Sequence, residues 1–353
     1  MDSIQPKKML IINILEILKK HSDAKHGLSQ KEIAYYLEKD YEMKADRKAI
    51  KRNLMNLAEF EGYTIEYDSE TKRTVRNYKT GELEEEDLLT DFRFIHDFDD
   101  SELRLLIDSL LFSKHIPYSQ CKDLIEKIEK LSSERFKSKM RHVCNMPENL
   151  PQNKELFYTI EMLDEAISTG RQVSFKYNRY GTDKKLHPRQ SSSGEDRVYI
   201  VNPYQMVATN GRYYLVCNYD KYDNIANYRV DMITDIKVLD SPVKPKKQVR
   251  GLEAGLDLPK HMAEHIYMFS DETVRVKFIA KKYIVGEIID WFGKDVKFSN
   301  ETEDEVTAEV RVSAMAMKFW ALQYAPHITV TEPKTLRDEI GTELRKAAER
   351  YGK

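Results

Sequence analysis

Cysteine is scarce in this chain of 353 residues, and its scarcity excludes a fold held together by disulfides. The three cysteines, Cys121, Cys144 and Cys217, show no spacing typical of paired metal ligands, and their odd number leaves one without a partner. Such usage is typical of proteins in a reducing cytosol. We therefore expect a cytoplasmic protein.

Long hydrophobic runs are also missing. The apolar segment 9–18 is interrupted by Asn13 and Glu16, and no stretch approaches the roughly 20 apolar residues of a membrane-spanning helix. We expect neither a membrane anchor nor a signal peptide, and no membrane partner.

Charge of one sign is not in excess either. The chain has 57 Lys and Arg against 59 Asp and Glu, which gives a formal net charge of −2. This excludes a uniformly basic protein that coats nucleic acid, so any contact with DNA must be local.

Catalytic motifs are nearly absent. We find no glycine-rich phosphate loop, no nucleophile elbow and no metal cluster, and we expect no cofactor and no enzyme activity. The exception is the segment His261-Met262-Ala263-Glu264-His265, whose histidines lie one helical turn apart as in one class of zinc peptidases. A metal-dependent hydrolase that uses His261, Glu264 and His265, or His187, is therefore an alternative. Because zinc needs a third protein ligand and a confined cleft, we favour a short helix that bridges two domains.

The length and the hydrophobic content of 41% predict two to four globular domains of an α+β multidomain protein. Hydrophobic periodicity and turn signals divide the chain at residues 1–80, 81–150, 151–242 and 243–353. The last of these boundaries follows Ser241-Pro242, and a stretch with two prolines at 146–151 marks the second.

Residues 1–80 have the pattern of a winged helix-turn-helix. A first amphipathic helix covers 8–20, and Ser29 to Glu32 forms a capping box that starts a second helix. Asp46 caps a third helix that runs to about Phe60, and strands at 63–67 and 73–78 form a hairpin behind it.

The exposed face of the third helix is basic, which indicates binding to a double-stranded DNA operator. Residues 1–80 hold 16 Lys and Arg against 13 Asp and Glu, with the positive charge concentrated between Lys44 and Arg52. Basic side chains at the start of a reading helix are what recognition of the major groove requires. The alternative is a solvated helix face on a winged helix that binds protein. The predicted DNA-binding residues are Arg47, Lys48, Lys51, Arg52 and Asn53 on the helix, with Lys72, Arg73 and Arg76 in the wing.

Residues 81–150 form a helical connector. The composition turns acidic, with 11 Asp and Glu against 2 Lys and Arg in residues 81–110, and the Glu84–Asp87 run is interpreted as a solvated helix start or linker. Apolar periodicity then predicts helices around Leu103–Leu111 and Leu124–Leu131. These helices and the C-terminal domain are the expected contacts of a homodimer.

Residues 198–238 form a meander of at least three antiparallel strands. Apolar and polar residues alternate along 199–207, 213–219 and 226–230, and Asn210-Gly211 is a strong signal for a tight hairpin turn. Meanders of this kind build small barrels.

Two short motifs in the meander resemble the signature of the WYL domain. They are Gly211-Arg212-Tyr213-Tyr214-Leu215 and Tyr228-Arg229-Val230-Asp231. Tyr213 stands where that signature usually carries Trp, and Met232 where many members have Arg or Lys. The resemblance implies a small Sm-like β-barrel that serves bacterial regulators as a ligand sensor. It further implies that the ligand is a nucleic-acid fragment or a nucleotide-like anion, which adjusts DNA binding.

The predicted ligand site combines charge and stacking. Arg229 offers a planar fork suited to phosphate, and tyrosines offer surfaces on which bases stack. Because neighbouring strand residues face opposite sides, we assign Tyr214 to the solvent face with Arg212, and Tyr213 to the interior with Leu215. The predicted ligand-binding residues are His187, Arg189, Tyr204, Tyr213, Tyr214, Arg229 and Asp231. In the alternative, a scaffold protein without a ligand, the tyrosines are strand formers and Arg229 merely pairs with Asp231.

The C-terminal region has the element order of a ferredoxin-like domain. Strands are expected at 273–279, 296–298, 306–312 and 328–330, with helices at 281–292, 315–324 and 334–350. Phe319-Trp320-Ala321-Leu322 and Glu332-Pro333 resemble the extension that accompanies WYL domains. Nearly the whole chain is thus similar to a ligand-responsive, DNA-binding transcriptional regulator that contains a WYL domain and acts as a homodimer.

Overall fold

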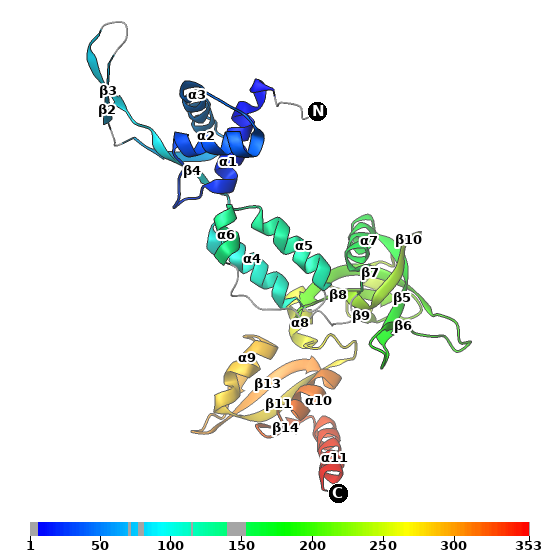
Figure 1. The fold of residues 1–353 in the computed structure, drawn as a ribbon. Coiled ribbons are helices and arrows are strands. Elements are labelled where there is room, and N and C mark those ends of the chain that lie inside the picture. Colours follow the sequence, from blue (N-terminus) through cyan, green and yellow to red (C-terminus); the bar gives the residue numbers. More distant parts are fainter. Residues whose placement is uncertain (1–5, 70–71, 77–80, 114–115, 140–152, 353) are drawn as a thin grey trace. The chain divides into compact units, whose positions relative to one another are not determined.

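The computed structural model describes residues 6–69, 72–76, 81–113, 116–139 and 153–352 (Figure 1). The chain divides into two compact units, residues 1–150 and residues 151–353, which are described separately. Their sheets are antiparallel, as expected of an α+β protein, and the predicted multidomain class of mixed helices and sheets is confirmed. None of the described helices is long and apolar enough to cross a membrane.

Three helices form the core of the first unit. After the short turn η1 (Lys7–Met9) come α1 (Leu10–His21), α2 (Gln30–Tyr41) and α3 (Arg47–Ala58). Ser29 and Glu32 form the expected capping box at the start of α2, and the Asp46 carboxylate accepts a hydrogen bond from the Ala49 amide at the start of α3. The order of these helices is the predicted one.

The hairpin after α3 is longer than predicted, and its pairing differs. β1 (Thr64–Asp68) pairs with β4 (Thr90–Ile95), while β2 (Lys72–Arg76) pairs with β3 (Leu83–Asp87). The prediction that strand 63–67 pairs with strand 73–78 is therefore wrong. Both strand pairs belong to one extended hairpin that reaches away from the three helices (Figure 1).

The acidic run 84–87 belongs to a strand, which corrects its interpretation as a helix start or linker. The backbone register sets Lys72 opposite Asp87 and Arg73 opposite Glu86. Residues of opposite charge that pair across two strands favour the strand conformation. Pairing with the basic strand therefore explains why the acidic run is a strand and not the start of a helix.

The connector helices are α4 (Asp100–Phe112), α5 (Tyr118–Glu129) and α6 (Glu134–Lys139). Leu103, Ile107 and Phe136 form their core. The connector touches the first three helices through His21, whose Nδ1 lies 2.7 Å from Glu134 Oε1. The proline-containing stretch 146–151 lies outside the described residues.

The second unit begins with α7 (Leu156–Thr169) and a sheet in the order β10-β5-β7-β8-β9, with β6 paired to β5. The bounds are β5 (Arg171–Tyr180), β6 (Leu186–Pro188), β7 (Val198–Thr209), β8 (Arg212–Tyr219), β9 (Ile225–Arg229) and β10 (Ile233–Pro242), with the turn η3 (Val230–Met232) before β10. Asn210 and Gly211 form the predicted turn between β7 and β8, with φ of 53° and 72°.

This sheet is not a closed barrel within the described residues, which corrects the expectation of a complete Sm-like barrel. The edge of β9 is covered by other groups instead of pairing with β10. The backbone amide of Asn227 in β9 donates to Ser270 Oγ at 2.9 Å, and the Arg250 amide donates to the carbonyl of Asp223, just before β9, at 2.7 Å. These bonds satisfy edge donors and acceptors that closure satisfies in a barrel.

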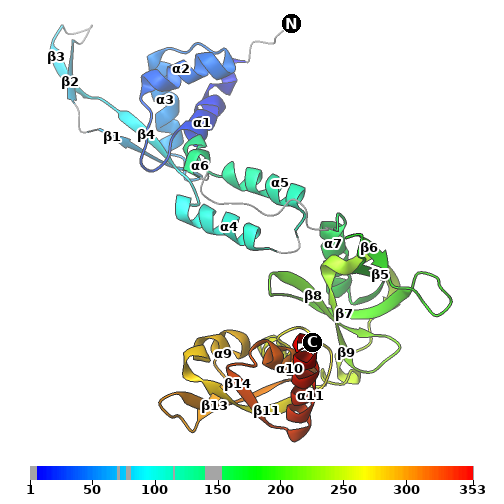
Figure 2. The same ribbon diagram turned by 60° about the horizontal axis from the view of Figure 1, so that its bottom comes forward.

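The last part of the chain follows the predicted order of strands and helices. After the turn η4 (Lys246–Gln248) and α8 (Leu258–Glu264) come β11 (Thr273–Lys281), the turn η5 (Lys282–Ile284), α9 (Val285–Phe292), β12 (Lys297–Ser299), β13 (Glu305–Ser313), α10 (Ala314–Gln323), β14 (Ile328–Glu332) and α11 (Lys334–Tyr351). The sheet order is β12-β13-β11-β14. Helices α9 and α10 lie beside this sheet (Figure 2), and Trp320, Phe278 and Phe292 fill the space between them.

Two of the three cysteines can be placed. Cys121 and Cys217 are buried free thiols, and burial raises the pKa of both. They lie in different units, and because both are buried in a core they serve as small apolar side chains. Cys144 lies outside the described residues.

Candidate functional site

The exposed face of α3 carries the predicted DNA-binding side chains. Ile50, Leu54 and Leu57 are buried at helical spacing, which turns Lys48 and Arg52 to solvent and leaves Lys51 half-buried. Arg47 is also exposed, but its Nε donates to Gln30 Oε1 at 3.3 Å, and Gln30 Nε2 donates to the Leu89 carbonyl at 3.1 Å. Arg47 therefore joins α3 to α2.

Asn53 has a local partner. Its Nδ2 donates to the Ala49 carbonyl at 2.8 Å, one turn earlier on the same helix. The side chain is half-buried, so a contact with a base edge would require this bond to break. The exposed cations Lys48 and Arg52 are better placed to meet a ligand.

The wing contains both signs of charge. Lys72 is exposed, and its Nζ lies 3.4 Å from Glu85 Oε2 on the facing strand. Arg73 and Arg76 lie in β2, but their side chains are outside the described part of the structure. Glu85 of β3 therefore offsets part of the positive charge of Lys72.

In the second unit, three arginines gather around one edge of the meander. Arg189 follows β6, Arg212 opens β8, and Arg229 ends β9. We call Arg189, Arg212 and Arg229 the arginine cluster. Arg189 lies over the ring of Tyr177 at 5.2 Å, and the Tyr177 hydroxyl accepts a hydrogen bond of 3.3 Å from the Arg229 amide.

Arg229 is held by Asp231 in a two-point pair. Nε donates to Oδ1 at 3.1 Å and Nη2 donates to Oδ2 at 2.6 Å. The Asp231 side chain is 7% exposed and that of Arg229 is 28% exposed. The pair fixes the guanidinium plane while the Arg229 side chain stays partly exposed, so Asp231 positions Arg229.

Arg212 contributes a donor that the protein does not use. Its Nε is buried and has no hydrogen-bond partner among the described residues. Burial raises the pKa of Tyr214, whereas the charges of Arg229 and Arg212 lower it, so both guanidinium groups act on the same ring. The arginine cluster can therefore stabilise an anion beside aromatic rings.

The prediction that Tyr214 lies on the solvent face is wrong. Tyr214 is only 8% exposed and packs with Val207, Val216 and Met268. Strand alternation correctly puts Tyr214 and Tyr213 on opposite faces, but alternation cannot tell which face is covered. Segment 256–268 covers the face of Tyr214, while Tyr213 is half-buried on the other.

The other two predicted ligand residues, Tyr204 and His187, have partners of their own. Tyr204 is buried with Val249 and Leu252 and donates its hydroxyl proton to the Lys244 carbonyl at 2.7 Å, and burial raises its pKa to about 12. His187 is exposed on β6, with Nε2 2.9 Å from both oxygens of Asp183. Tyr204 thus has a structural role, and His187 is bound within its own loop.

The His-x-x-Glu-His segment forms α8, and each of its polar side chains has another partner. His261 Nε2 lies 3.3 Å from Asn227 Oδ1, His265 Nδ1 lies 2.7 Å from the Phe269 carbonyl, and Glu264 pairs with Arg311 at 3.3 Å. Among the residues that the structure describes, no group of three or more His, Cys, Asp or Glu could hold a metal ion. The geometry gives the hydrolase alternative no support.

Burial lowers the pKa of His261 from its ordinary 6.5 to about 4, and His265 adds to the shift. Between pH 6.5 and 4 the unfolded chain binds a proton that the folded protein rejects, so stability falls as the pH falls through this window. We expect His261 to account for on the order of 3 kcal/mol of that loss. Urea unfolding at several pH values, compared with His261→Gln, measures it. An identical pH dependence in both proteins would contradict this.

Two family models match the second unit. Residues 158–238 match the WYL domain, and residues 270–348 match the WCX domain. The predicted WYL domain and its C-terminal extension are thereby confirmed. No curated protein matches the chain.

The solved structures that are similar to the chain include the following two. Proteasome accessory factor B/C (PafBC) of Arthrobacter aurescens is 15% identical with a TM-score of 0.29, over 98% of this chain and 49% of that one. The chain thus spans about half the length of that protein. A CRISPR Cas-related protein is 15% identical with a TM-score of 0.38, over 72% of this chain and 74% of the other. At these values neither carries an inference about function.

Proposed function

We propose that this protein, which carries a WYL domain followed by a WCX domain, is a DNA-binding transcriptional regulator. In this proposal α3 binds double-stranded DNA, and the arginine cluster of the WYL domain senses a nucleic-acid fragment or a nucleotide-like anion. Ligand binding then changes the affinity for DNA.

The observation that carries the DNA-binding proposal is the capped helix α3 with exposed Lys48 and Arg52. It follows α2 in the order of a helix-turn-helix, and the bond from Arg47 to Gln30 fixes one helix against the other. A rigid helix with cations on its outer face suits the major groove, where side chains of the first turns approach base edges and phosphates. Lys51 lies on the same helix.

Support for the sensing proposal comes from the partly exposed side chain of Arg229 and the unused donor of Arg212. An anion placed there would give Arg212 Nε the acceptor that it lacks. Because Asp231 already occupies two donors of Arg229, the ligand would bind the remaining Nη1. Arg189, exposed beside Tyr177, would complete the site.

We further propose that the protein is a homodimer, because a single winged helix contacts few base pairs and paired half-sites increase specificity. Within the first unit, α4 exposes Leu105 (68%) and Phe112 (80%), an apolar surface suited to a second copy. We expect a solution mass twice the monomer mass of 41.5 kDa. A monomer at micromolar concentration, with and without DNA, would contradict this.

The experiment that tests the proposed function is the capture of genomic DNA by the purified full-length chain, followed by sequencing of the bound fragments. We expect a shared sequence motif in the fragments. Fragments drawn evenly from the genome would contradict a role in regulating particular genes. Nucleic acid that remains bound to the WYL domain after purification would identify the class of the ligand.

A further inference from the structure

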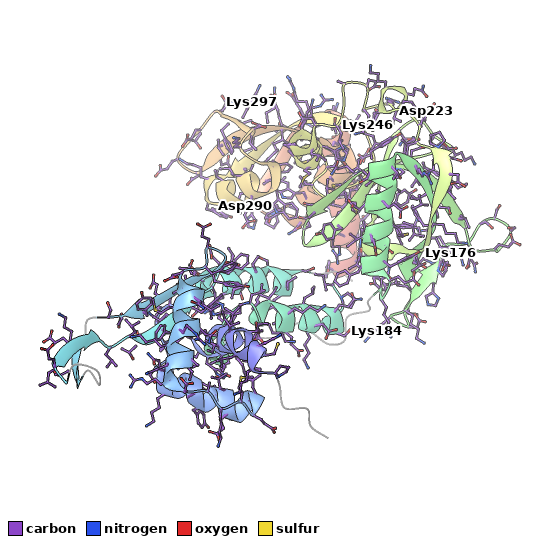
Figure 3. The ribbon with its side chains drawn as sticks, turned by 90° about the horizontal axis from the view of Figure 1, so that it is seen from above. Lys176, Lys184, Asp223, Lys246, Asp290 and Lys297 are labelled. Atoms are coloured by element: carbon purple, nitrogen blue, oxygen red, sulfur yellow. The ribbon has the colours of Figure 1, made fainter. Side chains whose placement is uncertain are left out.

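A cavity of about 1510 Å³ lies in the second unit, apart from the residues of the arginine cluster. It is bounded by the start of β9, the loop 250–257, α8 and the residues that precede β11. Asp223, labelled in Figure 3, is one of the residues that line it. The His-x-x-Glu-His segment supplies part of its wall, so a motif without a role in DNA binding or anion sensing faces an open space.

The polar base of this cavity is His261 with Asn227. His261 is 7% exposed, and its Nε2 lies 3.3 Å from Asn227 Oδ1. Asn227 also lines the cavity, and its Nδ2 is buried without a hydrogen-bond partner among the described residues. A buried donor without an acceptor is costly, so a ligand oxygen placed beside Asn227 would be favourable.

The wall of the cavity is acidic. Six carboxylates stand against three permanent cations: Asp223, Glu253, Asp257, Glu264, Asp271 and Glu272 against Arg250, Lys260 and Arg311. Burial lowers the pKa of His261 to about 4, so this imidazole adds no positive charge at neutral pH. The wall therefore repels phosphates and attracts cations.

Ion pairs engage only part of these carboxylates. Arg250 pairs with Glu272 at 2.5 Å, Arg311 pairs with Glu264 at 3.3 Å, and Lys244, outside the wall, pairs with Asp223 at 2.6 Å. Glu253 accepts a hydrogen bond from the Gly251 amide at 2.9 Å, a bond that does not neutralise its charge. Glu253 is thus a negative group at the cavity available to an external cation.

We propose that this cavity binds a small organic cation that carries a hydrogen-bond acceptor oxygen. The ammonium or guanidinium group would lie among the carboxylates, and the oxygen would accept the hydrogen bond of Asn227. This site is opposite in charge to the arginine cluster, and it does not depend on the function proposed above.

Calorimetry on the full-length chain with three probes tests this assignment. Argininamide has the cation and the amide oxygen, agmatine has the cation without the oxygen, and AMP is an anion. We expect millimolar or tighter binding of argininamide, weaker binding of agmatine, and no displacement of argininamide by AMP. Failure of argininamide to bind at about 10 mM would overturn the proposal.

Two variants locate the binding. Asn227→Ala removes the proposed donor, so it should weaken the binding of argininamide about tenfold while the affinity for agmatine stays unchanged. Glu253→Gln keeps an acceptor for the Gly251 amide but loses the negative charge. It should therefore weaken the binding of both argininamide and agmatine, and more strongly at low salt. Equal affinity of argininamide for the wild type and both variants would also overturn the proposal. Thermal unfolding of each variant verifies that it is folded.

Discussion

Replacing Lys48, Lys51 and Arg52 together by alanine is expected to weaken operator binding on the order of a hundredfold near physiological salt. Each cation that contacts a phosphate releases counterions, so the loss of three should reduce the slope of log affinity against log salt by about three units. Fluorescence anisotropy over a range of salt concentrations measures both quantities. The core of α3 is unaffected, because none of the three belongs to it.

A matched control separates this effect from net charge. Replacing Lys294, Lys297 and Arg345 by alanine removes the same three charges from exposed positions of the WCX region. We expect this control variant to bind the operator with nearly the same affinity and salt slope as the wild type. If the α3 variant behaves like the control, α3 is not the DNA-binding helix.

Replacing Arg229 by alanine is expected to abolish the response of DNA binding to short single-stranded oligonucleotides. A hydrogen bond between charged groups contributes about 1.5–3 kcal/mol, which corresponds to a 10- to 100-fold loss of ligand affinity. Basal DNA binding should persist, because Arg229 lies in the second unit and α3 in the first. Anisotropy with and without oligonucleotide measures the response.

Arg229→Ala also leaves the buried Asp231 carboxylate without its partner, which destabilises the fold. The double variant Arg229→Ala, Asp231→Asn removes that charge, so it should recover stability while remaining unresponsive. Asp231→Asn alone should still respond. A normal ligand response in the double variant would mean that Arg229 only pairs with Asp231, as in a scaffold without a ligand.

Local signals in the sequence predicted the elements that depend on neighbouring residues. The capping box at Ser29 and Glu32 and the turn at Asn210-Gly211 were identified because their chemistry is complete within four residues. The pairing of β2 with β3 was missed because an acidic run has no apolar alternation. The acidic run is favourable as a strand only because it pairs with the basic strand β2.

The ligand site was predicted only in part, because its members come from separate strands. Arg229 and Arg189 were identified from the sequence, but Arg212 and Tyr177 were not assigned to the site. Cross-strand pairing brings Arg229 next to Tyr214, and the burial of Tyr214 depends on Met268, far along the chain. The position of Arg212 directly after a predicted turn was the one signal that could have placed it at the sheet edge.

The central claim is that one chain binds DNA and that an anion at the WYL domain controls the affinity. The most direct test measures the binding of the full-length protein to a captured genomic fragment, with and without a short single-stranded oligonucleotide. The account predicts a change in DNA affinity of at least about tenfold, which disappears in the double variant Arg229→Ala, Asp231→Asn. Binding curves that coincide with and without the oligonucleotide, in a protein that binds the oligonucleotide, would contradict it.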